Sequence, residues 1–232
     1  MTTTTTTKTI LITGSNRGLG RLLLSSYLQR PNLTVIAAVR NPSHPTSQSL
    51  LTLPVHPSGT TRLIVVKLDL NVPTDPAAAV QELAEKHNID TIDVVIANAS
   101  VGWAWPRVRE AEVDDIRAHM ETNVFGFVEL AKALLPVLER TALAKNEKDK
   151  GRGEDKEVVW ITIGSGGGLN VSSSVFDIFF SFFSVFLFPL LSYPLMPPKF
   201  CTWVRVTTGK KFQGKGDGAE ELLWKKWKGQ GQ

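Results

Sequence analysis

The chain has 232 residues, 42% of them hydrophobic and 21% charged, which suits one α/β domain with a sizeable core. Its formal net charge of +4 arises in the residues from Lys199 onward, which sum to +5, so the basic balance gives no reason to expect nucleic-acid binding. A single cysteine, Cys201, excludes an internal disulfide and predicts a reducing compartment, hence the cytoplasm.

The N-terminal stretch carries six threonines, Thr2 to Thr7, and neither an apolar nor a basic signal region. We interpret residues 1–8 as a disordered lead-in and not as a signal peptide.

The first predicted elements lie in Thr9 to Gly20, which reads T-I-L-I-T-G-S-N-R-G-L-G. The apolar run predicts a buried parallel strand, and leucines at helical spacing after Gly20 predict a helix. Glycines between a strand and a helix N-terminus are typical of a dinucleotide-binding turn, because the backbone can approach a pyrophosphate there. The alternative is a glycine turn without a ligand. The residues predicted to contact a cofactor in this turn are Gly14, Asn16, Arg17, Gly18, Leu19 and Gly20.

The second predicted strand, Leu33 to Val39, ends at Arg40. An acidic residue near this position would bind the ribose 2′-hydroxyl of NAD, whereas an arginine accommodates a 2′-phosphate. Arg40 and Arg17 therefore predict NADP(H). The alternative is that both arginines are solvated surface residues.

Residues 41–61 predict a long loop with room for a short helix, and Arg62 to Leu68 a third strand that runs into Asp69 and Leu70. Asp75 is expected to cap a helix over 77–87, with Pro76 at its first position.

The fourth predicted strand, Thr91 to Ala97, runs into Asn98, Ala99 and Ser100. The loop after it holds Trp103 and Trp105, which either line an aromatic pocket or pack the loop against the domain.

One helical pattern covers Glu112 to Arg140, with Asn123 and Gly126 inside it and an irregular course expected there. The charged run 145–157 predicts a solvated, flexible connection. Val158 to Ile163 predicts the fifth strand, which Gly164 and Ser165 follow.

These features resemble the short-chain dehydrogenase/reductase family at six points in the same order, through T-G-x-x-x-G-x-G at 13–20 and A-N-A at 97–99 among others. The resemblance implies a Rossmann-type, doubly wound parallel sheet over 9–172, incomplete on its C-terminal side. It also implies NADP-dependent chemistry on a small carbonyl or alcohol, without a metal. The stretches L-Q-R-P-N-L-T-V-I-A-A-V-R-N-P and D-V-V-I-A-N-A are most similar to fungal ketoreductases of the norsolorinic acid type.

The same resemblance implies roles for individual residues. Asp69 is expected to contact the adenine with Leu70 beside it. Asn98 is expected to brace the central strands and to lie near the cofactor, and Ala99 to contact the cofactor. Asn123 would bend its helix and hold the active-site lysine through a water, and Ser165 would polarise the substrate carbonyl.

The family's proton donor, a tyrosine in Y-x-x-x-K about 13 residues after the serine, has no counterpart, and Ile178 stands there. The two tyrosines, Tyr27 and Tyr193, each have a proline four residues later. A positioned acid contributes about 10²–10⁴-fold to rate, so impaired catalysis is expected. A non-catalytic nucleotide-binding protein is the alternative.

The stretch 175–195 holds seven of the chain's eleven phenylalanines and a single charge. Its favoured interpretation is translated non-coding or frame-shifted sequence after about residue 172; a membrane anchor and a diverged catalytic half are the alternatives. We separate it as a hydrophobic segment, 173–198, from a basic tail, 199–232. The sequence predicts neither the oligomeric state nor the substrate.

Overall fold

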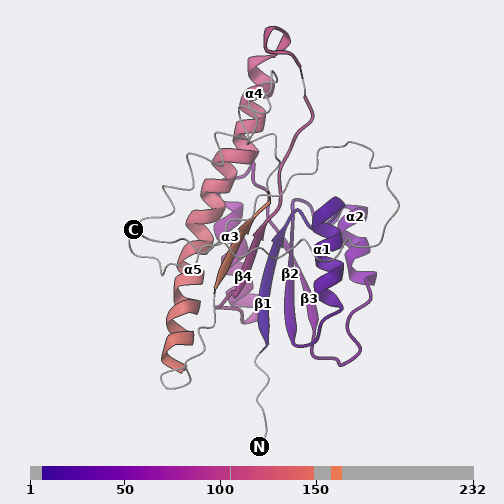
Figure 1. Ribbon diagram of the computed structural model, residues 1–232, viewed down its shortest axis with the longest axis vertical. Coiled ribbons are helices and arrows are strands. Elements are labelled where there is room, and N and C mark those ends of the chain that lie inside the picture. Colours follow the sequence, from indigo (N-terminus) through magenta and orange to yellow (C-terminus); the bar gives the residue numbers. More distant parts are fainter. Residues whose placement is uncertain (1–6, 105, 149–157, 164–232) are drawn as a thin grey trace, which may run out of the picture.

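Five parallel strands lie side by side in the computed structural model, which describes residues 7–104, 106–148 and 158–163 (Figure 1). Their spatial order is β3-β2-β1-β4-β5, with every neighbouring pair parallel. The strands are β1 (Lys8–Thr13), β2 (Leu33–Val39), β3 (Arg62–Lys67), β4 (Val94–Ala97) and β5 (Val159–Thr162). The order reverses beside β1, so the carboxyl ends of β1 and β4 flank the crevice where such sheets bind ligands. The predicted Rossmann-type parallel sheet is confirmed.

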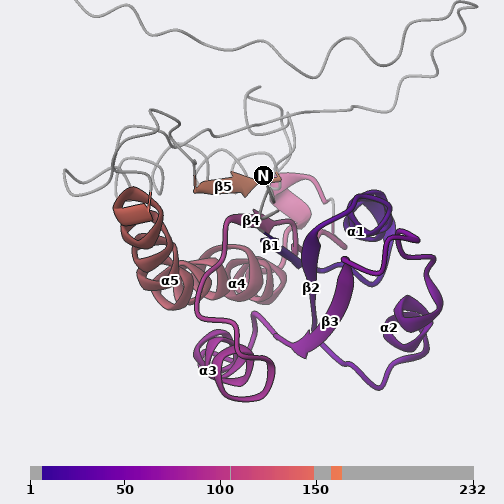
Figure 2. The same ribbon diagram turned by 90° about the horizontal axis from the view of Figure 1, so that it is seen from below.

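Helices cover both faces of this sheet (Figure 2). On one face lie α1 (Gly18–Leu28), α2 (Pro45–Gln48) and the 3₁₀ turn η1 (Ser49–Thr52); on the other lie α3 (Asp75–His87), α4 (Val113–Met120) and α5 (Gly126–Lys148). A short 3₁₀ turn, η2 (Val108–Glu110), and a π-helical turn, η3 (Glu121–Phe125), complete the described elements.

The core is divided by the alternation of side chains along each strand. Leu11 of β1 faces α3 and α5, whereas Ile10 and Ile12 face α1. Because both faces are covered, β2 is buried along its whole length, as its continuous apolar run predicts.

The helical pattern predicted over 112–140 is interrupted. The turn η3 separates α4 from α5, as the expected irregularity around Asn123 indicates. Gly126 follows at once, and a Cβ there would lie 2.2 Å from the backbone oxygen of Leu70. The start of α5 therefore packs directly on the backbone that follows β3.

The end of α5 corrects the prediction for the charged run 145–157. The helix continues to Lys148, and the half-buried Lys145 forms an ion pair with Asp93 immediately before β4. The ion pair with the buried Asp93, which is distant in sequence, stabilises helix in the first residues of this run. Residues 149–157 lie outside the described part of the chain.

No described helix has both the length and the apolarity needed to cross a membrane. Ser165, the segments 173–198 and 199–232, and residue 105 lie outside the described residues, as do threonines 2–6 of the predicted lead-in.

Candidate functional site

The turn between β1 and α1 depends on its glycines in two ways. Gly14 and Gly18 have φ of +64° and +54°, values that favour glycine. Gly20 has ordinary dihedral angles, but a Cβ there would lie 2.4 Å from the Gly14 oxygen and 2.6 Å from Nδ2 of Asn98. The turn thus closes tightly under the helix.

The space above this turn is open. A Cβ on Gly18 would meet no atom within 4 Å, and Leu19 is 50% exposed. The first N–H groups of α1 have no intrahelical acceptors, and together with the helix dipole they favour an anion at this end. The buried Ser15 hydroxyl has no hydrogen-bond partner among the described residues. The turn has the form of an anion cradle.

A polar contact fastens the turn to α2. Asn16 Nδ2 donates to Thr46 Oγ1 over 2.7 Å, and Arg21 Nη1 donates to Ser49 Oγ over 2.8 Å. In the structure the Asn16 amide holds the segment that follows β2, and the cofactor contact expected of Asn16 stays a prediction. No local sequence pattern indicates this contact, because its two sides lie far apart in the chain.

The two arginines on which the cofactor prediction rests are both exposed. Arg17 immediately precedes α1, and Arg40 immediately follows β2. Neither guanidinium forms a hydrogen bond or an ion pair with a described residue, so their donors are available to a ligand.

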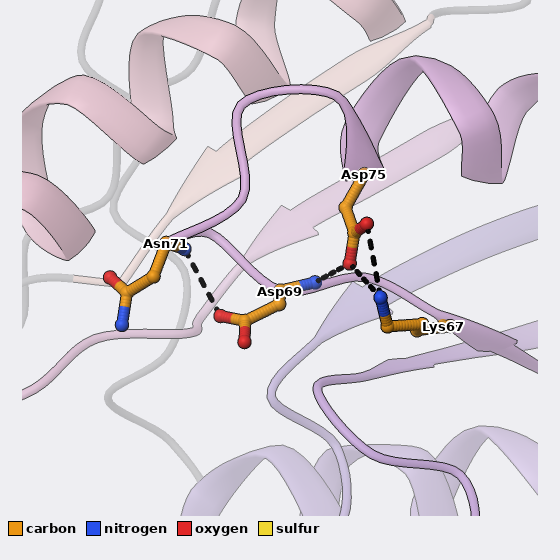
Figure 3. A network of polar contacts seen from close by, with 4 residues as sticks. All are labelled: Lys67, Asp69, Asn71 and Asp75. Carbon is orange, nitrogen blue, oxygen red and sulfur yellow. Dashed lines mark hydrogen bonds and ion pairs between the residues drawn. The ribbon is translucent and has the colours of Figure 1, made fainter.

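The end of β3 is shaped by a carboxylate network, which Figure 3 shows. Asp75 Oδ2 accepts the N–H of Asp69 over 3.0 Å and lies 3.0 Å from Lys67 Nζ. Asp69 Oδ1 accepts the N–H of Asn71 over 3.0 Å. The prediction that Asp75 caps α3 is therefore wrong: Asp75 is the first helical residue, and its carboxylate holds the backbone at the end of β3.

Asn98 joins the two strands beside the crevice. Its Nδ2 donates to the backbone oxygen of Thr13 over 2.9 Å. The Thr13 hydroxyl oxygen accepts the N–H groups of Asn98 and Ala99 over 3.0 and 2.9 Å. Asn98 and Ala99 thus fix the end of β4 against the glycine turn. The cofactor contacts expected of these two residues stay predictions.

Asn123 makes a two-point contact with one backbone unit. Its Oδ1 accepts the N–H of Val101, and its Nδ2 donates to the oxygen of Val101, each over 2.9 Å. The side chain thereby holds the loop after β4 against η3, a role that the sequence did not reveal.

An apolar pocket opens where β4 and β5 end. His119, buried and absent from the sequence-based candidates, lies in its wall, and its ring stacks on Trp103 with centroids 4.1 Å apart. Trp103 is 53% exposed and packs on His119, so of the two alternatives for this residue the packing one holds. The described lining is Ala97, Ala99, Ser100, Ala104, Pro106, Ala111, Glu112, Asp115, Ile116, His119, Met120, Asn123, Val124, Phe127, Thr162 and Ile163.

Within the described residues, no group of histidine, cysteine, aspartate and glutamate side chains is placed to hold a metal ion.

Comparison with known proteins agrees with this geometry. The family model described as short chain dehydrogenase matches residues 8–152. Norsolorinic acid ketoreductase nor1 of Dothistroma septosporum is 44% identical over 137 residues, covering 59% of this chain and 50% of that protein. Short chain dehydrogenase gsfK of Penicillium aethiopicum is 42% identical over 130 residues, covering 56% and 50%. The chain spans about half the length of the curated relatives it matches.

Solved structures show the same architecture. NADPH-bound carbonyl reductase from chicken fatty liver has a TM-score of 0.58 and 25% identity, covering 71% of this chain and 62% of that one. A short chain dehydrogenase/reductase from Burkholderia phymatum in complex with NAD has a TM-score of 0.65 at 18% identity, covering 86% and 64%, and shows the fold alone.

Proposed function

The chain belongs to the short-chain dehydrogenase family, and on that premise we propose that it is an NADP(H)-binding oxidoreductase of the ketoreductase type. Its substrate would be a small carbonyl compound or the corresponding alcohol. Ketoreductases among its similar relatives support this class of reaction. We also propose that the nucleotide-binding domain spans residues 9–172 and that the protein acts in the cytoplasm.

One observation supports the proposal: the turn over Gly14 to Gly20 is tightly closed at Gly14 and Gly20 and leaves open space beside Gly18. A side chain at Gly20 would collide with the turn itself, while the space above Gly18 is free. A pyrophosphate fits this donor set of helix N–H groups. Asp69, Leu70, Asn98 and Ala99 would line the rest of the cofactor's path.

The choice of NADP(H) over NAD(H) rests on Arg17 and Arg40. Both are cationic, exposed and unpaired with described residues, and no carboxylate follows β2 directly. A planar guanidinium binds a phosphate through paired hydrogen bonds, which gives the 2′-phosphate a partner that the 2′-hydroxyl does not need.

A bound nicotinamide supplies the hydride in such a reaction. The chain's own contribution begins with Ser165, whose hydroxyl would donate a hydrogen bond to the carbonyl oxygen. Asn123 positions the loop after β4 through Val101. The Y-x-x-x-K pair that would deliver the proton is absent from the sequence, so we propose impaired turnover.

Hydride transfer on the purified full chain tests the proposal. NADPH oxidation at 340 nm is followed with an aromatic ketone, and a family reductase that retains Y-x-x-x-K serves as the control. We expect turnover about 10²–10⁴-fold below the control. A Ser165→Ala variant should lower the residual rate further. Turnover equal to the control would contradict the proposed impairment.

A second candidate function, nucleotide binding without catalysis, is favoured by the missing tyrosine and lysine. It predicts NADPH binding with no hydride transfer at all. Attachment to a membrane through 175–195 is the third hypothesis, and partitioning of a fusion protein that carries 173–198 tests it.

A further inference from the structure

The apolar pocket at the ends of β4 and β5 has an unusual charge distribution. Most of its described wall is aliphatic or aromatic, from Ala97 and Ile163 beside the strands to Ile116, Met120 and Phe127 on the helices. Two carboxylates, Glu112 and Asp115, also line it, and its described lining contains no lysine or arginine.

The carboxylate of Asp115 has no hydrogen bond or ion pair with a described residue, although its side chain is half-buried. Arg117, two residues after Asp115 on α4, pairs instead with Asp114 over 3.0 Å, and Asp114 is not part of the lining. The arginine of α4 therefore forms its ion pair outside the pocket.

His119 also lines the pocket. Its Nδ1 lies 2.6 Å from the backbone oxygen of Asp115, and its Nε2 accepts the N–H of Trp103 over 3.3 Å. Both ring nitrogens therefore contact the backbone on either side of the pocket wall.

An apolar pocket whose described lining holds carboxylates but no lysine or arginine discriminates by charge. A ligand that carries its own anion meets the half-buried Asp115 and, at an exposed position, Glu112. One like-charge pair in a partly desolvated space changes affinity by about tenfold. A neutral ligand avoids this repulsion, and a hydroxyl on it can donate to a free carboxylate oxygen.

We propose that Asp115, together with Glu112, determines substrate specificity by admitting neutral, mainly apolar ketones that carry a hydroxyl and rejecting ketones that carry a carboxylate or phosphate. The inference rests on the proposed function for its assignment of the pocket to the substrate. On this proposal the substrates are free carbonyl compounds. Carbonyl compounds that are still covalently attached to a negatively charged carrier group do not bind.

The test compares three probes that share one ring system: 2-acetonaphthone, its 6-hydroxy derivative and 6-acetyl-2-naphthoic acid. Dissociation constants are measured by isothermal titration on the full chain at neutral pH and low salt, with and without NADPH. The hydroxy ketone should bind at least about tenfold more tightly than the acid. The Glu112→Gln/Asp115→Asn double variant should reduce this ratio to about twofold, and added salt should reduce it in the unmodified chain.

Asp114→Asn is the matched control, because it removes the same charge from the same turn of α4 outside the pocket. It should leave the ratio of the two dissociation constants unchanged.

If the carboxylates serve only to stabilise the N-terminus of α4, the double variant will lower the melting temperature without changing the ratio, and this overturns the proposal. Equal binding of the hydroxy ketone and the acid, or no binding of the hydroxy ketone, also overturns it. NADPH binding is measured in its own titration. A failure to bind NADPH would count against the proposed function, whereas the ratio of the dissociation constants of the acid and the hydroxy ketone would still test the role of the two carboxylates.

Discussion

Individual glycines in this protein are required for different physical reasons. Gly14 and Gly18 adopt positive φ, whereas Gly20 and Gly126 have ordinary dihedrals and leave no room for a Cβ. Gly18 alone combines a positive φ, open space and a position at the start of α1. The effect of Gly18 on the stability of the fold can therefore be measured separately from its effect on nucleotide binding.

Gly18→Ala and Gly59→Ala form a matched pair, since both glycines have positive φ and neither would place its Cβ within 4 Å of another atom. Each variant should lose about 1–2 kcal/mol in the free energy of unfolding, measured by urea denaturation. Only Gly18→Ala should weaken NADPH binding. If the two variants bound NADPH equally well, the anion cradle would be misplaced.

Arg17→Ala and Arg40→Ala should each raise the dissociation constant of NADPH by about tenfold and leave that of NADH nearly unchanged, because only NADPH carries the 2′-phosphate. Arg30→Ala is the control, since Arg30 lies over the Tyr27 ring, 5.1 Å from its centroid, beyond the other end of α1. An unchanged ratio of the two constants in both variants would support the alternative that these arginines are surface residues.

At the scale of elements, the helices are fastened to the sheet by polar contacts between residues distant in sequence. Lys145 near the end of α5 pairs with Asp93, whose Oδ2 also accepts the N–H of Thr9 over 2.6 Å. Thr141 accepts the N–H of Ile92 over 3.0 Å. Together these contacts hold the amino ends of β1 and β4 against one helix.

Lys145→Met should lower the free energy of unfolding by about 3 kcal/mol, because it leaves the buried Asp93 carboxylate without its ion-pair partner. The Asp93→Asn/Lys145→Met double variant should lose less, since no charge is left unpaired. Lys132→Met, which breaks an exposed pair with Glu129, should cost less than about 0.5 kcal/mol. If Lys145→Met and Lys132→Met lost the same free energy of unfolding in urea denaturation, the Lys145–Asp93 ion pair would not have the stabilising role given to it here.

Asn123→Ala should cost about 2 kcal/mol, because it removes both hydrogen bonds to the backbone of Val101. The amide of Val101 should then exchange faster with deuterated water. Glu121→Ala, at an exposed position of the same turn, should change neither quantity. Unaltered exchange at Val101 in Asn123→Ala would contradict the two-point contact.

The sequence predicted most strands because their signal is local. The run from Leu33 to Val39 is apolar throughout, and β2 has these bounds. It could not predict that Gly126 packs on Leu70, or that Lys145 is held by Asp93, because each contact joins residues far apart in the chain. The residues of the candidate site show the same difference. The glycine turn and Asn98 could be predicted because they belong to a local sequence motif, whereas His119 and Thr46 belong to none.

At the scale of the whole molecule, the described residues form a parallel sheet with a nucleotide-type crevice at its carboxyl edge. The chain spans about half the length of its curated relatives and lacks a Y-x-x-x-K pair. Nucleotide binding by residues 9–172 and slow hydride transfer remain predictions for this chain.

Titration of the purified full chain with NADPH and NADH, by isothermal calorimetry under identical conditions, measures both the affinity of the nucleotide site and its preference between the two cofactors. We expect a dissociation constant in the micromolar range for NADPH and a value at least about tenfold higher for NADH. Absence of NADPH binding at about 1 mM ligand would contradict the nucleotide site itself, and equal constants would contradict the role of the two arginines.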